Sequence, residues 1–265
     1  MKKFVIILSV VVVAMNSFAQ KNYNAKYRLG STFATTSQYN LLIGENQNLL
    51  QTTPKALGSG VYDFSGMYSV IGVWLYNPNK RNIGLGFSPV LKVSKFRFTN
   101  NYKIVNNTFS LDLDPEHTFY EGYFNRDGSK LVVKKIVLPL VIFFPISKWV
   151  NSNNKTVGLY ITPFFETYAY GYHKLFYHDA SGKLRKIKTD NAVIRQMITP
   201  NNYGIRIGMK IKHLYLYAQY TFLNFFKENT GLNVNELNAG IGINWLEWWL
   251  DSDDNNSPKS KATSL

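Results

Sequence analysis

The chain has 265 residues, no cysteine and a formal net charge of +14. The absence of cysteine excludes disulfides, thiol nucleophiles and cysteine-based metal sites, so stability must come from packing and backbone pairing. Aromatic residues make up 15% of the sequence, a high share for a soluble domain. Tyr and Trp concentrate at membrane interfaces because their rings are apolar at one end and polar at the other.

Residues 1–19 have the layout of a secretory signal peptide. Lys2 and Lys3 precede an apolar run over residues 4–15, and Ser17 and Ala19 supply the small residues of a cleavage site. The run is too short for a membrane-spanning helix, which needs about 20 residues. We therefore expect cleavage after Ala19 and export. An exported protein rarely meets nucleic acid, so we assign the positive charge to anionic lipid head groups, with solvated loops as the alternative.

Eight segments have strand patterns. In chain order they lie near residues 26–36, 60–76, 82–98, 130–144, 156–173, 201–211, 213–224 and 235–245. Residues 82–93, 202–212 and 237–245 alternate most clearly between apolar and polar side chains, as expected when successive side chains face opposite sides of a sheet. The first segment is the weakest, and the fourth is apolar on both faces.

The polar face of these strands combines glycine with long basic side chains, as in Gly204, Arg206, Gly208 and Lys210. A narrow barrel interior needs small residues beside long ones, whereas a soluble β-sandwich directs bulky apolar residues inward. We therefore predict that the opposite, apolar face contacts lipid. Its predicted members are Leu85, Phe87, Ile205, Ile207, Ile241 and Ile243.

The connections alternate in length. Residues 37–59, 99–129 and 174–200 form long connections, whereas residues 77–81 and the link near 212–213 are short. Short periplasmic turns and longer outer loops are typical of transmembrane barrels. The predicted fold is therefore all-β: an up-and-down antiparallel transmembrane β-barrel of about eight strands over residues 20–250, with a polar, filled lumen. Residues 251–265 are predicted to be a disordered, polar periplasmic tail.

Several short stretches follow one another in a specific order: KIVLPL at 135–140, VGLYI at 157–161, YGIRIG at 203–208 with LYLYAQY at 214–220, and LNAGIGI at 237–243. In this order they resemble the small, porin-like outer-membrane β-barrel domain family. The resemblance covers residues 60–245 and implies about eight antiparallel strands behind a secretory signal. It implies no single activity, because the family includes secretion-system accessory barrels and proteins without a known role.

Charged residues inside the strand patterns predict an ion-pair network in the lumen. Basic side chains lie on the glycine-bearing faces, and two carboxylates are expected to face the same way. Isolated charges are costly in a poorly hydrated interior, so the acids should lie beside the bases. The predicted members are Arg28, Asp63, Lys92, Glu166, Arg206 and Lys210.

A second candidate site is the basic part of the connection 174–200. Lys183, Arg185, Lys186 and Lys188 could bind the phosphates of an anionic lipid such as lipopolysaccharide. A solvated loop explains these residues equally well.

Two alternatives belong to other functional classes. A lipid-modifying enzyme, acting on acyl chains or lipid A, needs a nucleophile and a base within hydrogen-bond reach. His173 and His178 lie near Asp179 and Ser181 in the sequence, but loops favour Asp and Ser anyway, and no His–Ser pair carried by strands is expected. A soluble lipocalin-like carrier would direct apolar residues inward.

The favoured interpretation is a non-enzymatic outer-membrane protein. Its role would be structural, that of a receptor, or that of an accessory in secretion or envelope maintenance. Eight strands leave an interior filled by side chains, so no wide pore is expected. The expected partners are outer-membrane lipids, including lipopolysaccharide, the barrel assembly machinery and an envelope protein, with no nucleic acid, cofactor or metal.

Overall fold

The computed structural model describes residues 28–30, 34–44, 66–69, 73–76, 84–87, 89–98, 101–120, 128–146, 157–211 and 214–244. These residues form one large antiparallel sheet and a separate two-stranded hairpin, which confirms the predicted all-β, antiparallel class. The predicted signal peptide 1–19, the predicted tail 251–265 and Asp63 lie outside the described residues.

The large sheet contains twelve strands. They are β1 (Arg28–Gly30), β2 (Ala34–Gly44), β3 (Gly66–Ser69), β4 (Val73–Tyr76), β5 (Gly84–Phe87), β6 (Val90–Arg97), β9 (Gly128–Pro145), β10 (Val157–His178), β11 (Leu184–Thr189), β12 (Asn201–Ile211), β13 (Leu214–Thr221) and β14 (Val234–Asn244). The hairpin consists of β7 (Tyr102–Val105) and β8 (Thr108–Leu111). A short helix, α2 (Asn191–Met197), and a 3-10 turn, η3 (Glu228–Thr230), complete the described elements.

Neighbouring strands pair in the order β9, β6, β3, β2, β14, β13, β12, β10, and β10 also pairs with β9. β5 continues the β6 side of β9, where Phe87 lies opposite Leu140 and Val90 opposite Val137. The break between β5 and β6 contains Pro89, which has no N–H to donate to the ladder. β1, β4 and β5 extend this side of the sheet, and β11 extends the other side beyond β10.

Three predicted connections contain regular structure, so those boundaries were wrong. β2 continues to Gly44 because it pairs with β14 along its whole length, from Ala34 opposite Asn244 to Gly44 opposite Val234. The strand has no clear alternation in the sequence, because it begins with a polar stretch at 35–38 and ends with three consecutive apolar residues at 41–43. The connection 99–129 contains the β7–β8 hairpin, and the connection 174–200 contains the end of β10, β11 and α2.

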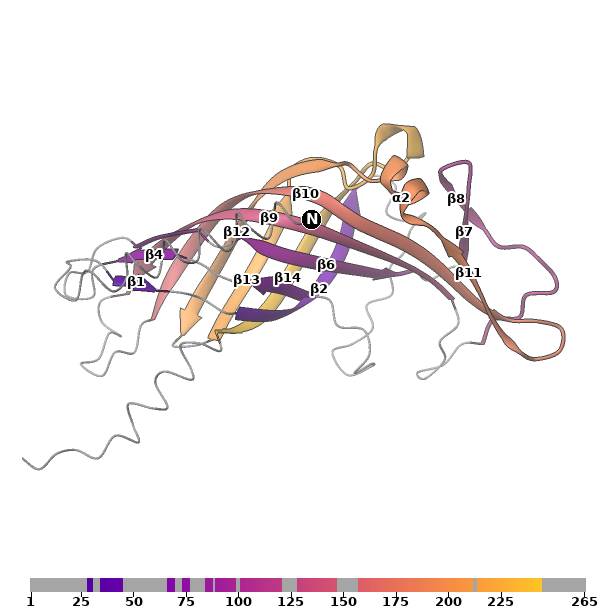
Figure 1. The fold of residues 1–265 in the computed structure, drawn as a ribbon, viewed down its shortest axis with the longest axis horizontal. Coiled ribbons are helices and arrows are strands. Elements are labelled where there is room, and N and C mark those ends of the chain that lie inside the picture. The colour runs from indigo at the N-terminus through magenta and orange to yellow at the C-terminus, as the bar shows by residue number, and fades with distance from the viewer. Residues whose placement is uncertain are drawn as a thin grey trace, which may run out of the picture.

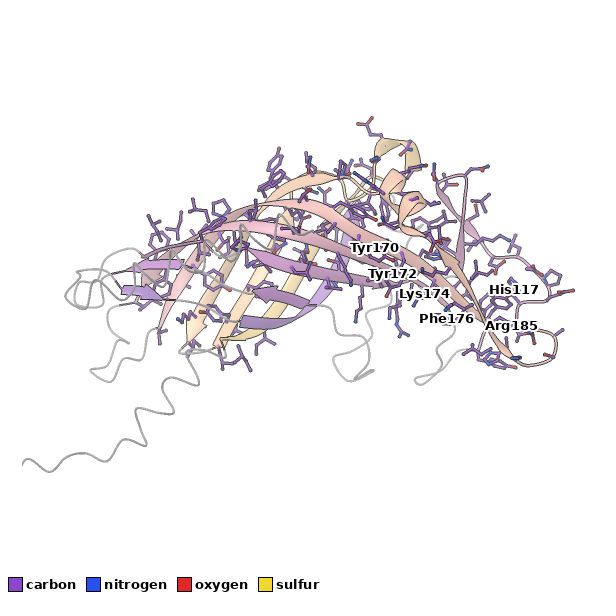
Figure 2. The ribbon with its side chains drawn as sticks, viewed as in Figure 1. His117, Tyr170, Tyr172, Lys174, Phe176 and Arg185 are labelled. Atoms are coloured by element: carbon purple, nitrogen blue, oxygen red, sulfur yellow. The ribbon has the colours of Figure 1, made fainter. Side chains whose placement is uncertain are left out.

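The two longest strands define the long axis of the molecule. β9 and β10 cross it side by side in Figure 1, with β11, the β7–β8 hairpin and α2 at one end and β1 and β4 at the other. Residues 157–167 of β10 pair with β12, whereas residues 173–178 pair with β11 instead. Figure 2 shows Tyr170, Tyr172, Lys174 and Phe176 following one another along this second part of β10. We call residues 168–178 the β10 extension.

The sheet buries polar residues on one face and exposes apolar residues on the other. β6 and residues 158–166 of β10 alternate between buried and more exposed positions. Large apolar side chains that are more than a third exposed include Leu85, Phe87, Leu91, Leu138, Leu140, Leu159, Ile161, Phe165, Ile207, Leu216 and Ile241. Of the six residues predicted to contact lipid, Leu85, Phe87, Ile207 and Ile241 are exposed, and Ile205 and Ile243 are partly exposed.

Among the described residues, no helix combines the length and the apolar character needed to cross a bilayer.

Candidate functional site

Four charged side chains from four strands meet on the buried face of the sheet. Lys92 of β6 donates hydrogen bonds to Glu166 of β10 at 2.9 Å and to Glu236 of β14 at 2.8 Å. Lys135 of β9 donates to Glu166 and, at 3.3 Å, to Glu236. The four side chains are 2% exposed or less. We call Lys92, Lys135, Glu166 and Glu236 the charge quartet.

The charge quartet has no formal net charge, since it contains two ammonium groups and two carboxylates. Charges this deeply buried persist only when they are paired and hydrogen-bonded. Ser94 adds a hydroxyl donor to Glu236, on the same face of β6 as Lys92. The quartet thereby joins β6 to β14, which are separated in the sheet by β3 and β2.

A second polar layer lies beside the quartet. Arg206 of β12 donates from Nε and Nη2 to Oε1 of Gln219 on β13, at 3.1 and 2.9 Å. Its guanidinium lies 5.2 Å from the centroid of the Tyr217 ring. Arg206 and Gln219 are both buried, so this layer continues the polar interior along the strands.

Buried aromatic rings fill the next part of this face, and glycines make room for them. A Cβ atom on Gly204 would collide with the carbonyl oxygen of Tyr220 and the ring of Phe164, and one on Gly208 would collide with the ring of Tyr160. Such close approaches allow glycine alone. The combination of glycine with large neighbours was predicted from the sequence, although aromatic rings occupy much of the space assigned there to basic side chains.

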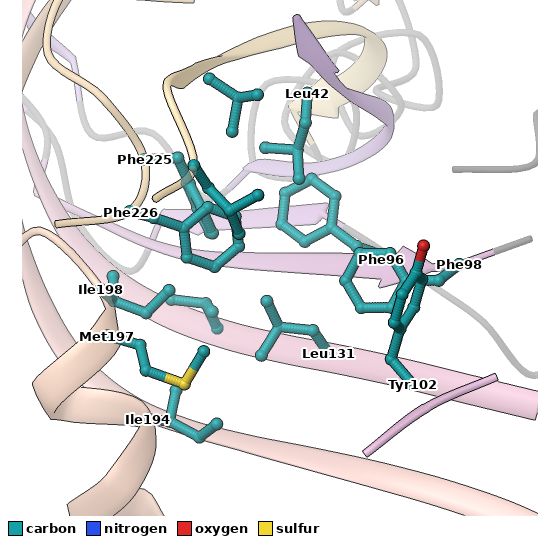
Figure 3. Packing of buried hydrophobic residues seen from close by; sticks show 13 residues of the cluster. Leu42, Phe96, Phe98, Tyr102, Leu131, Ile194, Met197, Ile198, Phe225 and Phe226 are labelled. Carbon is teal, nitrogen blue, oxygen red and sulfur yellow. The ribbon is translucent and has the colours of Figure 1, made fainter. Parts of the chain in front are cut away.

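An apolar cluster closes the face beyond the quartet, toward α2. It contains Leu42, Phe96, Phe98, Tyr102, Leu131, Val133, Ile194, Met197, Ile198, Phe225, Phe226, Leu232 and Val234. We call it the apolar cap; Figure 3 shows how α2 and the segment before β14 contribute to it. The Lys135 ammonium lies 4.6 Å from the centroid of the Phe225 ring, so the cap contacts the quartet directly.

The residues predicted to form one ion-pair network in the lumen lie in several different environments. The structure brings Lys92 and Glu166 together, and it buries Arg206 against the side-chain amide of Gln219. Lys210 is half-buried, with its ammonium 5.5 Å from the centroid of the Tyr215 ring. The side chains of Arg28 and Asp63 lie outside what the structure describes.

Two members of the charge quartet, Glu236 and Lys135, were not predicted from the sequence. Glu236 lies two residues before Asn238, on the polar face already recognised in that strand, so the alternation could have identified it. Lys135 lies in a strand that is apolar on both faces, and the preceding Lys134 faces the other way. A charged residue inside such a strand was the available signal.

The four basic residues of the second candidate site do not form one group. Lys186 and Lys188 lie on the same face of β11, opposite Phe176 and Lys174 of β10. Arg185 faces the other way and donates to Asp179 at 2.7 Å. The Lys183 backbone N–H also donates to Asp179, as part of the turn between the two strands. Hydrogen bonds from Ser181, Arg185 and Lys183 hold the pKa of Asp179 below its usual range.

The expectation that strands carry no His–Ser pair was wrong. Ser129 of β9 and His173 of the β10 extension share a hydrogen bond of 2.7 Å between Oγ and Nε2. Both are buried, Nδ1 of His173 has no partner, and burial lowers the pKa of His173 to about 4. A base of this kind needs an orienting partner and access to substrate, so the pair as it stands is suited to packing rather than to hydrolysis.

A third polar cluster anchors the segment that follows β8. His117 stacks on Tyr177, with ring centroids 3.5 Å apart, and its Nδ1 contacts Asp112 at 2.5 Å. Burial alone would raise the pKa of Asp112, but hydrogen bonds from His117 and Lys103 outweigh it and hold this pKa below its usual value. Within the described ranges, no three residues among His, Asp and Glu converge as metal ligands would.

The comparisons with known proteins identify no relative: no protein-family model and no curated protein matches the sequence, and no solved structure matches the fold.

Proposed function

We propose that this chain is an outer-membrane protein that forms a closed, eight-stranded barrel with a packed interior. Its role would be structural, that of a receptor, or that of an envelope or secretion accessory. The observation that carries the proposal is the inverted distribution of side chains: the charge quartet is buried, whereas Leu85, Ile207 and Ile241 are exposed. A protein in water gains free energy by the opposite arrangement. A barrel surrounded by lipid favours an apolar outer face and a polar inner face.

The strand pairings support closure. Starting from β9, the pairings pass through β6, β3, β2, β14, β13, β12 and β10, and the pairing of β10 with β9 completes a circuit of eight strands. In a bilayer every backbone group needs a partner within the protein, so a closed sheet is favoured over one with open edges.

Strand length also fits a bilayer. β2, β12 and β14 each have 11 residues, and a tilted transmembrane strand needs about 9–11 residues. The spanning part of β10 would be residues 157–167, where it pairs with β12. The β10 extension would then stand outside the hydrocarbon layer.

The exposed face changes character along β10 in the way expected at a membrane surface. Leu159, Ile161 and Phe165 are followed by Tyr170 and then by Lys174. Aromatic residues and lysines occupy the interfacial region because each has an apolar part and a polar end. This order supports an outer surface whose apolar residues contact the hydrocarbon layer and whose following Tyr and Lys residues lie among the lipid head groups.

The filled interior argues against a wide channel and against a carrier. The quartet, the Arg206 layer and the apolar cap occupy successive levels of the buried face. A lipocalin-like carrier needs an apolar cavity for its ligand. Outer-membrane lipids and the barrel assembly machinery are the partners that the proposal implies, with an envelope protein as the partner of an accessory role.

Refolding into phosphatidylcholine vesicles tests the proposal. We expect the purified chain to float with the vesicles after an alkaline wash and to migrate differently on a gel before and after boiling. Protease should leave a protected fragment that includes β12–β14. A chain that stays soluble without detergent, and that migrates identically in both conditions, would contradict it.

A further inference from the structure

Lysines from three adjacent strands form a row on the exposed side of the β10 extension. Lys174 of β10 lies directly opposite Lys130 of β9 on one side and Lys188 of β11 on the other. Lys186 lies two residues from Lys188 on the same side of β11. We call Lys130, Lys174, Lys186 and Lys188 the lysine row.

Like charges placed directly opposite one another on a sheet reduce stability. Burial, and then the proximity of Lys186, Lys130 and Lys188, lower the pKa of Lys174. Asp190 contacts Lys188 at 2.9 Å, but the Asp190 side chain is largely exposed to solvent, which weakens this ion pair. The row therefore concentrates positive charge that a bound anion would stabilise.

Two tyrosines border the lysine row on the same strand. The Lys174 ammonium lies 4.7 Å from the centroid of the Tyr172 ring, and the Lys134 ammonium lies 5.9 Å from that of Tyr170. Cation–π contacts of this kind hold a lysine against a ring while leaving its N–H groups available to an acceptor. Figure 2 shows Tyr170, Tyr172 and Lys174 in sequence along β10.

We propose that the lysine row binds the phosphate-bearing head group of an anionic lipid, whose acyl chains lie along the exposed apolar face of β9 and β10. The order of side chains along β10 supports a lipid, because Phe165 and Leu159 continue from the row toward the other end of the strand. A phosphate monoester offers several oxygens, which three or four ammonium groups can share. This inference rests on the proposed outer-membrane barrel.

The test uses the full mature chain, refolded in neutral detergent micelles and titrated with phosphatidic acid. Native mass spectrometry counts the lipids that remain bound. The K174Q/K188Q variant should bind phosphatidic acid about tenfold or more weakly, since each lysine near an anionic lipid contributes roughly 1 kcal/mol. The K174R/K188R variant keeps the charge and should retain binding. Should K174Q/K188Q fail to refold, the single K186Q variant, at an exposed position, gives the same comparison.

The matched control is R195Q/K227Q, which removes the exposed Arg195 and the partly exposed Lys227 at the same end of the molecule but away from the row. It should change the affinity by less than about twofold, because distant exposed charges are screened by salt. An equal loss in both double variants would overturn the proposal, since net charge alone would explain it. Displacement of the lipid by inorganic phosphate at millimolar concentration would also overturn it, in favour of a site for the free ion.

The two proposals fail in distinguishable ways. A chain that enters phosphatidylcholine vesicles but retains no phosphatidic acid contradicts the lipid site and leaves the barrel intact. A chain that enters neither vesicles nor micelles contradicts both.

Discussion

Glu236 of β14 accepts a hydrogen bond from Lys92 of β6 at 2.8 Å, across 144 residues of sequence. Because two strands separate β14 from β6 in the sheet, this contact crosses the interior instead of following the backbone ladder. Glu166 and Lys135 complete the same cluster from β10 and β9. One compact polar group thus constrains the relative positions of four strands.

Removing one charge of the quartet should cost more than removing a balanced pair. Glu236→Gln leaves two buried ammonium groups with one carboxylate, and breaking a buried pair in this way costs about 3–5 kcal/mol. The double variant Glu236→Gln/Lys92→Met restores the balance and should recover much of that loss. Urea unfolding of all variants, analysed as a double-mutant cycle, measures the coupling. Glu228→Gln, at an exposed position in η3, is the control; additive effects at positions 236 and 92 would contradict the prediction.

An arginine on the exposed apolar face distinguishes lipid from water as the surrounding medium. Ile207 is 55% exposed, so Ile207→Arg should hardly affect a protein in water. Near the middle of a bilayer the same change should cost about 2–4 kcal/mol, measured as the folded fraction in phosphatidylcholine vesicles over a urea series. Leu113→Arg, at a loop position that is 82% exposed, should have little effect. Equal and small effects at both positions would count against a membrane barrel.

A single methyl group at Gly204 should destabilise the fold. The new Cβ atom would collide with the Tyr220 carbonyl oxygen and the Phe164 ring, and overpacking of this kind typically costs about 1–3 kcal/mol. Urea unfolding of Gly204→Ala measures the change. Ala218→Val adds carbon atoms at an exposed position of β13 and should leave stability near that of the parent chain. A fully stable Gly204→Ala variant would show that ring and backbone are free to separate.

Stability should fall in mild acid because of His173, which lies in the β10 extension. Burial lowers its pKa to about 4, whereas the unfolded chain titrates near pH 6.5. The unfolded chain therefore binds the proton first. The contribution of this residue is complete above about pH 6.5, declines toward pH 4, and does not decline further below that value.

His173→Gln should remove this dependence, making the loss between about pH 7 and pH 4 smaller by up to roughly 3 kcal/mol. Ser129→Ala removes the hydrogen bond to the ring but leaves the imidazole in place, so it should retain the parent slope. Unfolding free energies measured across this pH range decide the matter; parallel curves for His173→Gln and the parent would contradict the assignment.

The alternation of apolar and polar residues predicted much of the fold and part of the candidate site. It identified the all-β class, most strand cores and the exposed positions of Leu85 and Ile207, because a period of two follows directly from strand geometry. It failed where tertiary pairing decides the outcome: β2 extends to Gly44 because β14 lies beside it. Alternation also does not reveal the bulge between Tyr168 and Tyr170, where an extra residue reverses which side chains face outward.

The candidate sites were less accessible to sequence reasoning. Alternation assigned faces to Lys92 and Glu166 but could not show which side chains meet, since these lie 74 residues apart. The lysine row depends on the register of three strands, and Lys130 and Lys188 are neighbours of Lys174 only after that register is known. Register between distant strands is set by the assembled sheet.

The position of β11 has a consequence for how copies of this protein behave toward one another. Its described pairings are all with β10, so its other side is an edge of the sheet. Edges of this kind recruit strands from other molecules unless charged side chains discourage them. Leu184–Thr189 carries Arg185, Lys186 and Lys188 along that edge, and a second copy approaching in the same way would bring an identical set of cations. The charges on β11 thus discourage edge-to-edge aggregation at the end of the β10 extension.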